Sequence, residues 1–101
     1  MDEARTTAWI MYALALASQK EPATFAAISQ VADGINHAVP THSELQRALK
    51  WLITSGMAQK VGPGYLLTPQ GSEVVASVRS EHSTTSQVWL ALTASLGTLV
   101  L

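Results

Sequence analysis

The chain has no cysteine and few charged residues. The absence of cysteine from its 101 residues excludes disulfide bonds and thiolate metal sites. Charged residues make up only 13% of the sequence, against a usual share of about 25%. Hydrophobic residues make up 48%. This balance excludes a solvated disordered tail and indicates helices that bury themselves in protein, including a second copy of the chain.

An excess of positive charge is also missing, since the net charge is −1. Domains that bind nucleic acid usually carry a basic face that displaces counterions from the phosphates. Only the docking face needs that charge, however. Residues 41–64 contain three cations, Arg47, Lys50 and Lys60, against one acid, Glu44. The sequence therefore has a small local excess of positive charge in this stretch.

No apolar run reaches the roughly 20 residues that a bilayer span requires. The two longest candidates are residues 8–17 and residues 88–101, and the second is interrupted by Thr, Ser and Gly. Asp2 and Glu3 precede the first run, whereas an export signal begins with positive charge. We therefore expect no membrane segment and a cytoplasmic location.

Two helices are expected in the first third of the chain. Thr6 or Thr7 should cap a first helix of about residues 6–19, which is apolar on nearly all sides. Thr24 should cap a second helix, and Asp33-Gly34 should end it. A helix that is apolar all round lies at the centre of a core or between subunits.

The clearest local signals lie between residues 40 and 68. Thr41 and Glu44 have the spacing of a capping box, in which each side chain accepts a hydrogen bond from the other's backbone amide. A helix of about residues 42–55 should follow, and Gly56 is placed to end it in a left-handed conformation. Its apolar stripe comprises Leu45, Ala48, Leu49, Leu52 and Ile53, and its opposite face comprises Ser43, Gln46, Arg47, Lys50 and Thr54.

A short hairpin and another helix are expected next. Residues 57–61 and 65–68 read as strands, joined by the turn Gly62-Pro63-Gly64. Thr68-Pro69 has the pattern of a helix cap followed by proline at the first helical position. The fourth helix should therefore begin directly after the hairpin.

The C-terminal part is expected to end in a fifth helix. Residues 80–86 are polar and favour a hinge, and a helix of about residues 85–101 should follow. Together with the first helix, it is expected to form the seam of a homodimer. The seam residues would be Trp9, Tyr12, Leu16, Val88, Trp89, Leu92 and Leu96.

Four phrases follow one another in the middle of the chain: TFAAISQVADGI, THSELQRALKWLITSG, MAQKV and GYLLTPQG. They resemble the winged helix-turn-helix superfamily of bacterial transcriptional regulators, in particular its MarR-like and PadR-like groups. The resemblance covers about residues 24–78. It implies a single, mostly α domain over residues 1–101, with a three-helix core, a small β-hairpin as the wing, and extra N- and C-terminal helices.

The resemblance also implies a function: the third helix reads the major groove of double-stranded DNA, and the protein acts as a homodimer. Arg47 can bond a guanine edge and Gln46 an adenine edge, while Lys50 and Lys60 serve phosphates. The residues implied to bind DNA are Thr41, His42, Ser43, Gln46, Arg47, Lys50, Thr54 and Lys60. The turn Gly62-Pro63-Gly64 carries no cation, which departs from the family pattern.

One other function fits the same fold, namely a protein–protein interaction module that does not bind DNA. Enzymatic chemistry is not expected, because the chain has no Gly-x-Ser-x-Gly elbow and no cluster of acids. His37, His42 and Glu44 lack an established metal-ligand spacing. We therefore expect no catalytic residues, no metal and no cofactor.

Overall fold

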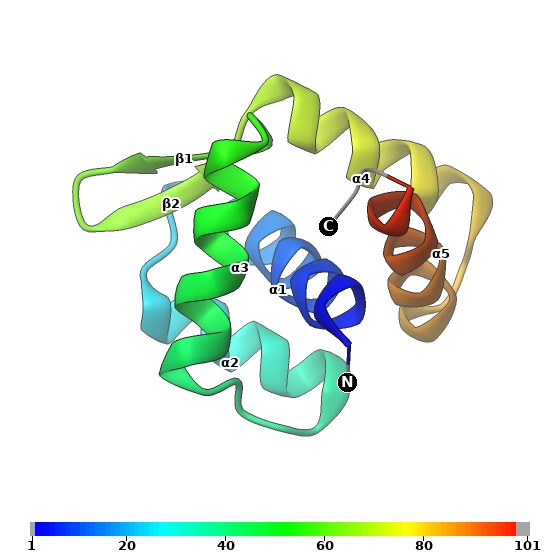
Figure 1. The fold of residues 1–101 in the computed structure, drawn as a ribbon, viewed down its shortest axis with the longest axis horizontal. Helices are drawn as coiled ribbons and strands as arrows, with labels where there is room; N and C mark the ends of the chain where they lie inside the picture. Colours follow the sequence, from blue (N-terminus) through cyan, green and yellow to red (C-terminus); the bar gives the residue numbers. More distant parts are fainter. Residues whose placement is uncertain (1, 99–101) are drawn as a thin grey trace.

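The computed structural model describes residues 2–98 of the chain (Figure 1). Within them, five helices accompany one two-stranded antiparallel sheet, which confirms the expectation of a mostly helical chain with a small hairpin. The elements follow in the order α1 (Glu3–Ala17), α2 (Phe25–Asn36), α3 (His42–Thr54), β1 (Ala58–Val61), β2 (Gly64–Leu67), α4 (Pro69–Glu81) and α5 (Thr85–Gly97). No helix in this part of the chain has the length and hydrophobicity that a membrane span needs.

Helix α1 lies at the centre of the structure. It packs against α2 and α3 on one side and against α5 on the other (Figure 1), and its residues 7–14 are all buried. The Trp9 indole N–H donates a hydrogen bond to the carbonyl of Ala32 in α2 at 2.9 Å. The ring of Trp9 also contacts Trp89 of α5, with 6.2 Å between the ring centroids. A helix that is apolar on all sides is thus the core of a single chain.

The N-terminus of α1 differs from the expectation. Asp2 is the cap, and its side chain accepts a hydrogen bond from the backbone amide of Arg5 at 2.8 Å. The expected caps Thr6 and Thr7 were wrong, because both lie inside the helix that Asp2 has already begun. The helix also ends two residues before the expected position, at Ala17.

Helix α2 does not end at Asp33-Gly34 as expected. It continues to Asn36, and His37 takes the left-handed conformation with φ of 54°. The backbone amide of His37 donates to the carbonyl of Asp33 at 2.7 Å, which satisfies a carbonyl in the last turn. Gly34 keeps helical geometry, because glycine permits a left-handed stop without requiring one.

The signals around α3 are confirmed. The Glu44 amide donates to the Thr41 hydroxyl oxygen at 3.0 Å, and the Thr41 amide donates to the Glu44 carboxylate at 2.8 Å. Gly56 follows the helix with φ of +79°. Its conformation turns the chain sharply, so that β1 begins two residues later.

The hairpin has a tighter turn than expected. Val61 pairs with Gly64, so the loop contains only Gly62 and Pro63, and Gly64 already belongs to β2. Gly62 has φ of +59°, as the first loop residue of a type II′ turn requires.

A third backbone segment joins the edge of β2. Ala23, between α1 and α2, exchanges two hydrogen bonds with Tyr65, at 2.7 and 2.8 Å. This bridge holds the start of α2 beside the hairpin.

The last two helices begin as the sequence indicates. Thr68 caps α4 with Pro69 at its first position, and the Thr68 hydroxyl also donates to the carbonyl of Gly56 at 2.6 Å. A capping box of Thr84 and Gln87 starts α5. The expected hinge over residues 80–86 is therefore reduced to residues 82–84. The expected helix reached residue 101, and its residues 99–101 lie outside the described part.

Two glycines give a matched test of the packing. A Cβ on Gly71, in the first turn of α4, would overlap the carbonyl oxygen of Met57. Gly71→Ala should therefore lower the free energy of unfolding by about 2 kcal/mol. A Cβ on Gly34 would meet open space, so Gly34→Ala should raise the free energy of unfolding by about 0.5–1 kcal/mol. Urea denaturation measures both, and equal effects of the two substitutions would contradict the described packing.

Candidate functional site

The exposed face of α3 is the candidate site. Leu45, Ala48, Leu49 and Leu52 are buried, and α3 packs against α1. Because the helix rotates about 100° per residue, the polar residues between them point outward. Every residue implied to bind DNA is exposed, namely Thr41, His42, Ser43, Gln46, Arg47, Lys50 and Thr54 of this helix and its cap, and Lys60 of β1.

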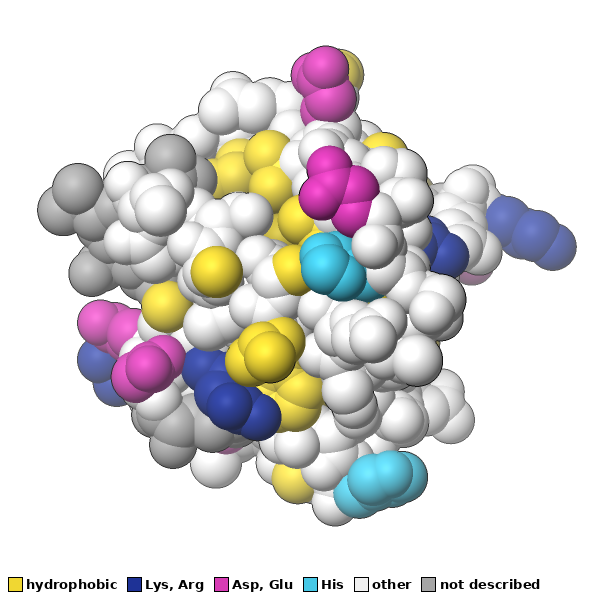
Figure 2. All heavy atoms as spheres, turned by 90° about the vertical axis from the view of Figure 1, so that its right-hand side faces the viewer, with side chains coloured by type: hydrophobic (Ala, Val, Ile, Leu, Met, Phe, Trp, Pro, Cys, Tyr) yellow, Lys and Arg dark blue, Asp and Glu magenta, His cyan; other side chains and the backbone are white. Residues whose placement is uncertain are grey.

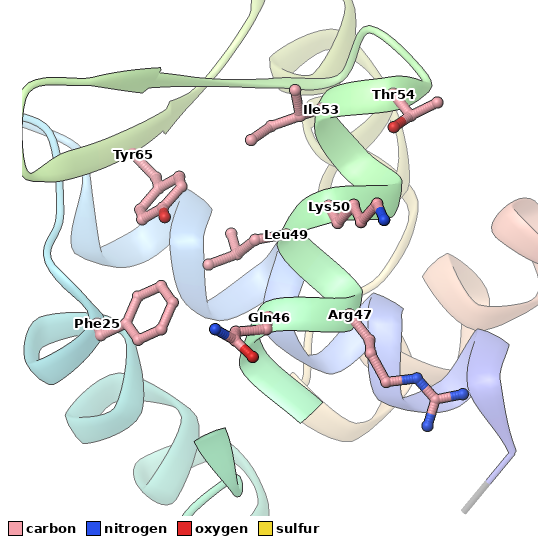
Figure 3. Close-up of a pocket in the computed structure, with 8 residues that line it drawn as sticks. All are labelled: Phe25, Gln46, Arg47, Leu49, Lys50, Ile53, Thr54 and Tyr65. Carbon is pink, nitrogen blue, oxygen red and sulfur yellow. The ribbon is translucent and has the colours of Figure 1, made fainter. Parts of the chain in front are cut away.

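A hollow of about 490 Å³ lies beside this face, bordered by α3, β2 and the start of α2. Figure 3 shows that Gln46 and Leu49 extend from α3 toward Phe25 and Tyr65, whereas Arg47 and Lys50 extend along the other side of the helix. The lining thus has an apolar part, Phe25, Leu49, Ile53 and Tyr65, and a polar part, Gln46, Arg47, Lys50 and Thr54. The hollow is open to solvent on one side.

Aromatic rings from separate elements form a row at this hollow. The ring of Phe25 stacks on Tyr65 with 5.6 Å between the ring centroids. The centroid of the His42 ring also lies 5.3 Å from that of Phe25. The Lys60 ammonium lies 5.9 Å from the centroid of the Tyr65 ring, within the range of a cation–π contact. The bridge between Ala23 and Tyr65 holds this row together, since it places the start of α2 against β2.

Among the described residues, Arg47 is the cation of the site that forms an ion pair. The Arg47 guanidinium makes an ion pair with the Glu3 carboxylate at 3.2 Å, and the two side chains are 71% and 64% exposed. Exposed pairs of this kind contribute about 1 kcal/mol or less to stability. Arg47 can therefore leave Glu3 at little cost when another anion approaches.

The expected dimer seam is located inside the single chain. Six of its seven residues are buried there, namely Trp9, Tyr12, Val88, Trp89, Leu92 and Leu96. The seventh, Leu16, is partly buried and packs against the same core. These side chains leave almost no surface for a second copy. The assignment of these residues failed because an apolar stripe indicates burial without indicating which chain covers it.

Several residues of the hollow have no clear signal in the sequence. Ile53 was expected in the buried stripe, but it is 40% exposed. It lies about 80° around the helix from Leu45, at the edge of that stripe. Phe25 and Tyr65 were expected only as parts of a helix and a strand. The backbone bridge that unites them gives no sequence signal, and neither does the approach of Glu3 to Arg47.

Comparisons with protein-family models, with curated proteins and with solved structures give no match. The candidate site is therefore defined by its own geometry: a polar, weakly basic helix face beside a partly aromatic hollow.

The weakness of the Arg47–Glu3 pair can be measured. Glu3→Gln should change the free energy of unfolding by less than about 0.5 kcal/mol, because both side chains are largely in water. Glu73→Gln, at an exposed position on α4, is the matched control. Urea denaturation of both variants tests this. Because Glu3 also lies in the first turn of α1, where an acid contributes up to about 1 kcal/mol through the helix dipole, only a loss clearly above about 1 kcal/mol would show that the pair holds Arg47 in place.

Proposed function

We propose that the chain is a winged helix-turn-helix domain that binds double-stranded DNA and regulates transcription. The order of elements supports this: α1, the bridged residue Ala23, α2, α3 and then the hairpin β1–β2. In this reading α3 is the recognition helix and the hairpin is the wing. The resemblance of residues 24–78 to winged-helix regulators supports the same reading.

The observation that carries the proposal is the uncovered polar ridge of α3. Gln46, Arg47 and Lys50 are all exposed on this helix, and an α-helix fits the major groove of B-form DNA. The Arg47 guanidinium suits the two acceptors of guanine, and the Gln46 amide suits the donor and acceptor of adenine. Lys50 on α3 and Lys60 on β1 would contact phosphates.

Binding by one chain should be weak and sensitive to salt. Three cations neutralise few phosphates, and Arg47 must first leave Glu3. A homodimer doubles the number of contacts and reads two half-sites. We therefore include dimerisation in the proposal.

The outer face of α5 is the surface that best fits such a dimer. Residues 83–101 contain no Asp, Glu, Lys or Arg, and Leu90 on this helix is 63% exposed. Figure 2 shows the side of the molecule on which α5 lies, where hydrophobic and uncharged polar side chains lie beside charged ones. A cation borders this helix, since the Arg5 guanidinium lies 4.6 Å from the centroid of the Trp89 ring. Two copies of α5 can meet without repulsion between like charges on the helix itself, with Arg5, which lies beside Trp89 and Leu90, at the border of the contact.

DNA binding can be tested by comparing two double variants, each of which lacks two cations. The double variant Arg47→Ala with Lys50→Ala should bind a random-sequence duplex about tenfold or more weakly at low salt, because it loses two charges on the reading face. The slope of log K against log salt should also become less steep by about 1, because Lys50 is the phosphate contact of this pair. Fluorescence anisotropy at several salt concentrations measures both quantities.

The matched control removes two cations elsewhere, with Lys20→Ala and Arg79→Ala. Lys20 follows the end of α1, and Arg79 lies on α4 beside a different hollow. This control should bind DNA like the unchanged protein. If the unchanged protein does not bind at low salt, or if the two double variants bind equally, the DNA proposal fails.

Dimerisation through α5 predicts a position-specific effect. Leu90→Asp should convert the dimer to a folded monomer, since it places charge in the centre of the seam without touching the core. Val39→Asp, at a residue that is 68% exposed on the loop before α3, is the control and should leave the dimer intact. Sedimentation equilibrium distinguishes these outcomes. A protein that is monomeric before substitution would refute the dimer.

A further inference from the structure

DNA binding leaves the apolar part of the hollow without a role. The DNA duplex would meet the protruding ridge of α3, where Arg47 and Lys50 lie, whereas Phe25, Leu49 and Tyr65 line a recess beside that ridge. Base edges and phosphates present mainly polar atoms. Ile53, which is 40% exposed at the border of the recess, offers them no hydrogen bond. A concave, mostly apolar recess with polar groups at its border is the usual form of a site that takes up an apolar group of another molecule.

The size and charge of the hollow indicate what would occupy it. Its volume of about 490 Å³ is enough for one or two large side chains. None of the eight described lining residues is acidic, and a cation borders the recess on each side: Lys50 across α3, and Lys60 over the Tyr65 ring. The third cation, Arg47, is paired with Glu3. An apolar recess between cations is complementary to an apolar side chain between carboxylates.

A free small molecule fits this geometry poorly. Sites for small ligands bury most of the ligand surface, whereas this hollow is open on one side. A peptide segment gains additional contacts along α3 outside the recess. The open shape and the flanking cations together favour a segment of a protein.

We propose that the hollow binds an acidic segment of a partner protein, which inserts one aromatic or large aliphatic side chain between Phe25, Ile53 and Tyr65. Carboxylates on either side of this anchor pair with Lys50 and Lys60. Lys50 also belongs to the proposed DNA contact, so the segment and the duplex exclude each other. This exclusion rests on the proposed function, whereas binding of the segment does not.

The experiment uses two fluorescein-labelled peptides and the full chain. One peptide carries a central Phe flanked by Glu residues, and in the other Ser replaces the Phe at the same net charge. By anisotropy, the Phe peptide should bind about tenfold more tightly than the Ser peptide, because only its anchor is buried in the recess. No binding of the Phe peptide, or equal binding of the two peptides, would overturn the inference.

Variants of the protein locate the binding site. Ile53→Ser should weaken binding of the Phe peptide by about tenfold and leave the Ser peptide unaffected. Ile53→Leu should bind like the unchanged protein, and Val39→Ser, at an exposed residue outside the hollow, should have no effect. Urea denaturation checks that each variant is folded. Binding of the Phe peptide that does not respond to Ile53→Ser would place the peptide elsewhere and refute the site.

A competition arm separates this inference from the proposed function. The unlabelled Phe peptide should displace a labelled duplex from the unchanged protein, and about tenfold more peptide should be needed for Ile53→Ser. If the chain binds the Phe peptide through Ile53 but binds no DNA, the DNA proposal fails and the peptide site stands. If it binds DNA and the peptide does not displace the duplex, mutual exclusion is wrong.

Discussion

Helix α1 carries apolar side chains around its whole circumference, and these leave water only if other helices surround it. Helices α2 and α3 cover one side and α5 covers the other. The polar atoms of Trp9 and Trp89 at this centre are also hydrogen-bonded. The Trp9 N–H donates to the backbone carbonyl of Ala32, and the Trp89 N–H donates to the backbone carbonyl of Arg5. Removing this central helix would leave the remaining elements without a common core.

The position of the candidate site follows from that packing. Because the stripe of Leu45, Leu49 and Leu52 faces inward, the polar residues of α3 must face solvent. Ala23 then ties the end of the first connection to Tyr65, which brings Phe25 to the edge of α3. The result is one surface with two chemical characters, a polar ridge that suits nucleic acid and an apolar recess that suits a side chain.

Local signals allowed much of the fold to be predicted. Some features depend only on neighbours in sequence, so the sequence predicts them. They are the capping box of Thr41 and Glu44, the left-handed Gly56 and the Thr68-Pro69 start of α4. Errors arose where two signals competed. Asp2 caps α1 four residues before the first of the expected threonines, and α2 continues through Gly34 to end at His37. The exposed face of α3 was predictable for the same reason as its buried stripe, namely its helical period.

By itself, the sequence determined which helix faces are apolar, where most helices begin and which residues of α3 point outward, because these properties depend on spacing along the chain. The tertiary structure decided which apolar faces meet. It placed Trp9 against Trp89 within one chain, Glu3 beside Arg47, and Phe25 beside Tyr65. Those pairs are 80, 44 and 40 residues apart in sequence, and hydrophobic attraction has no direction that would specify a partner at such a separation.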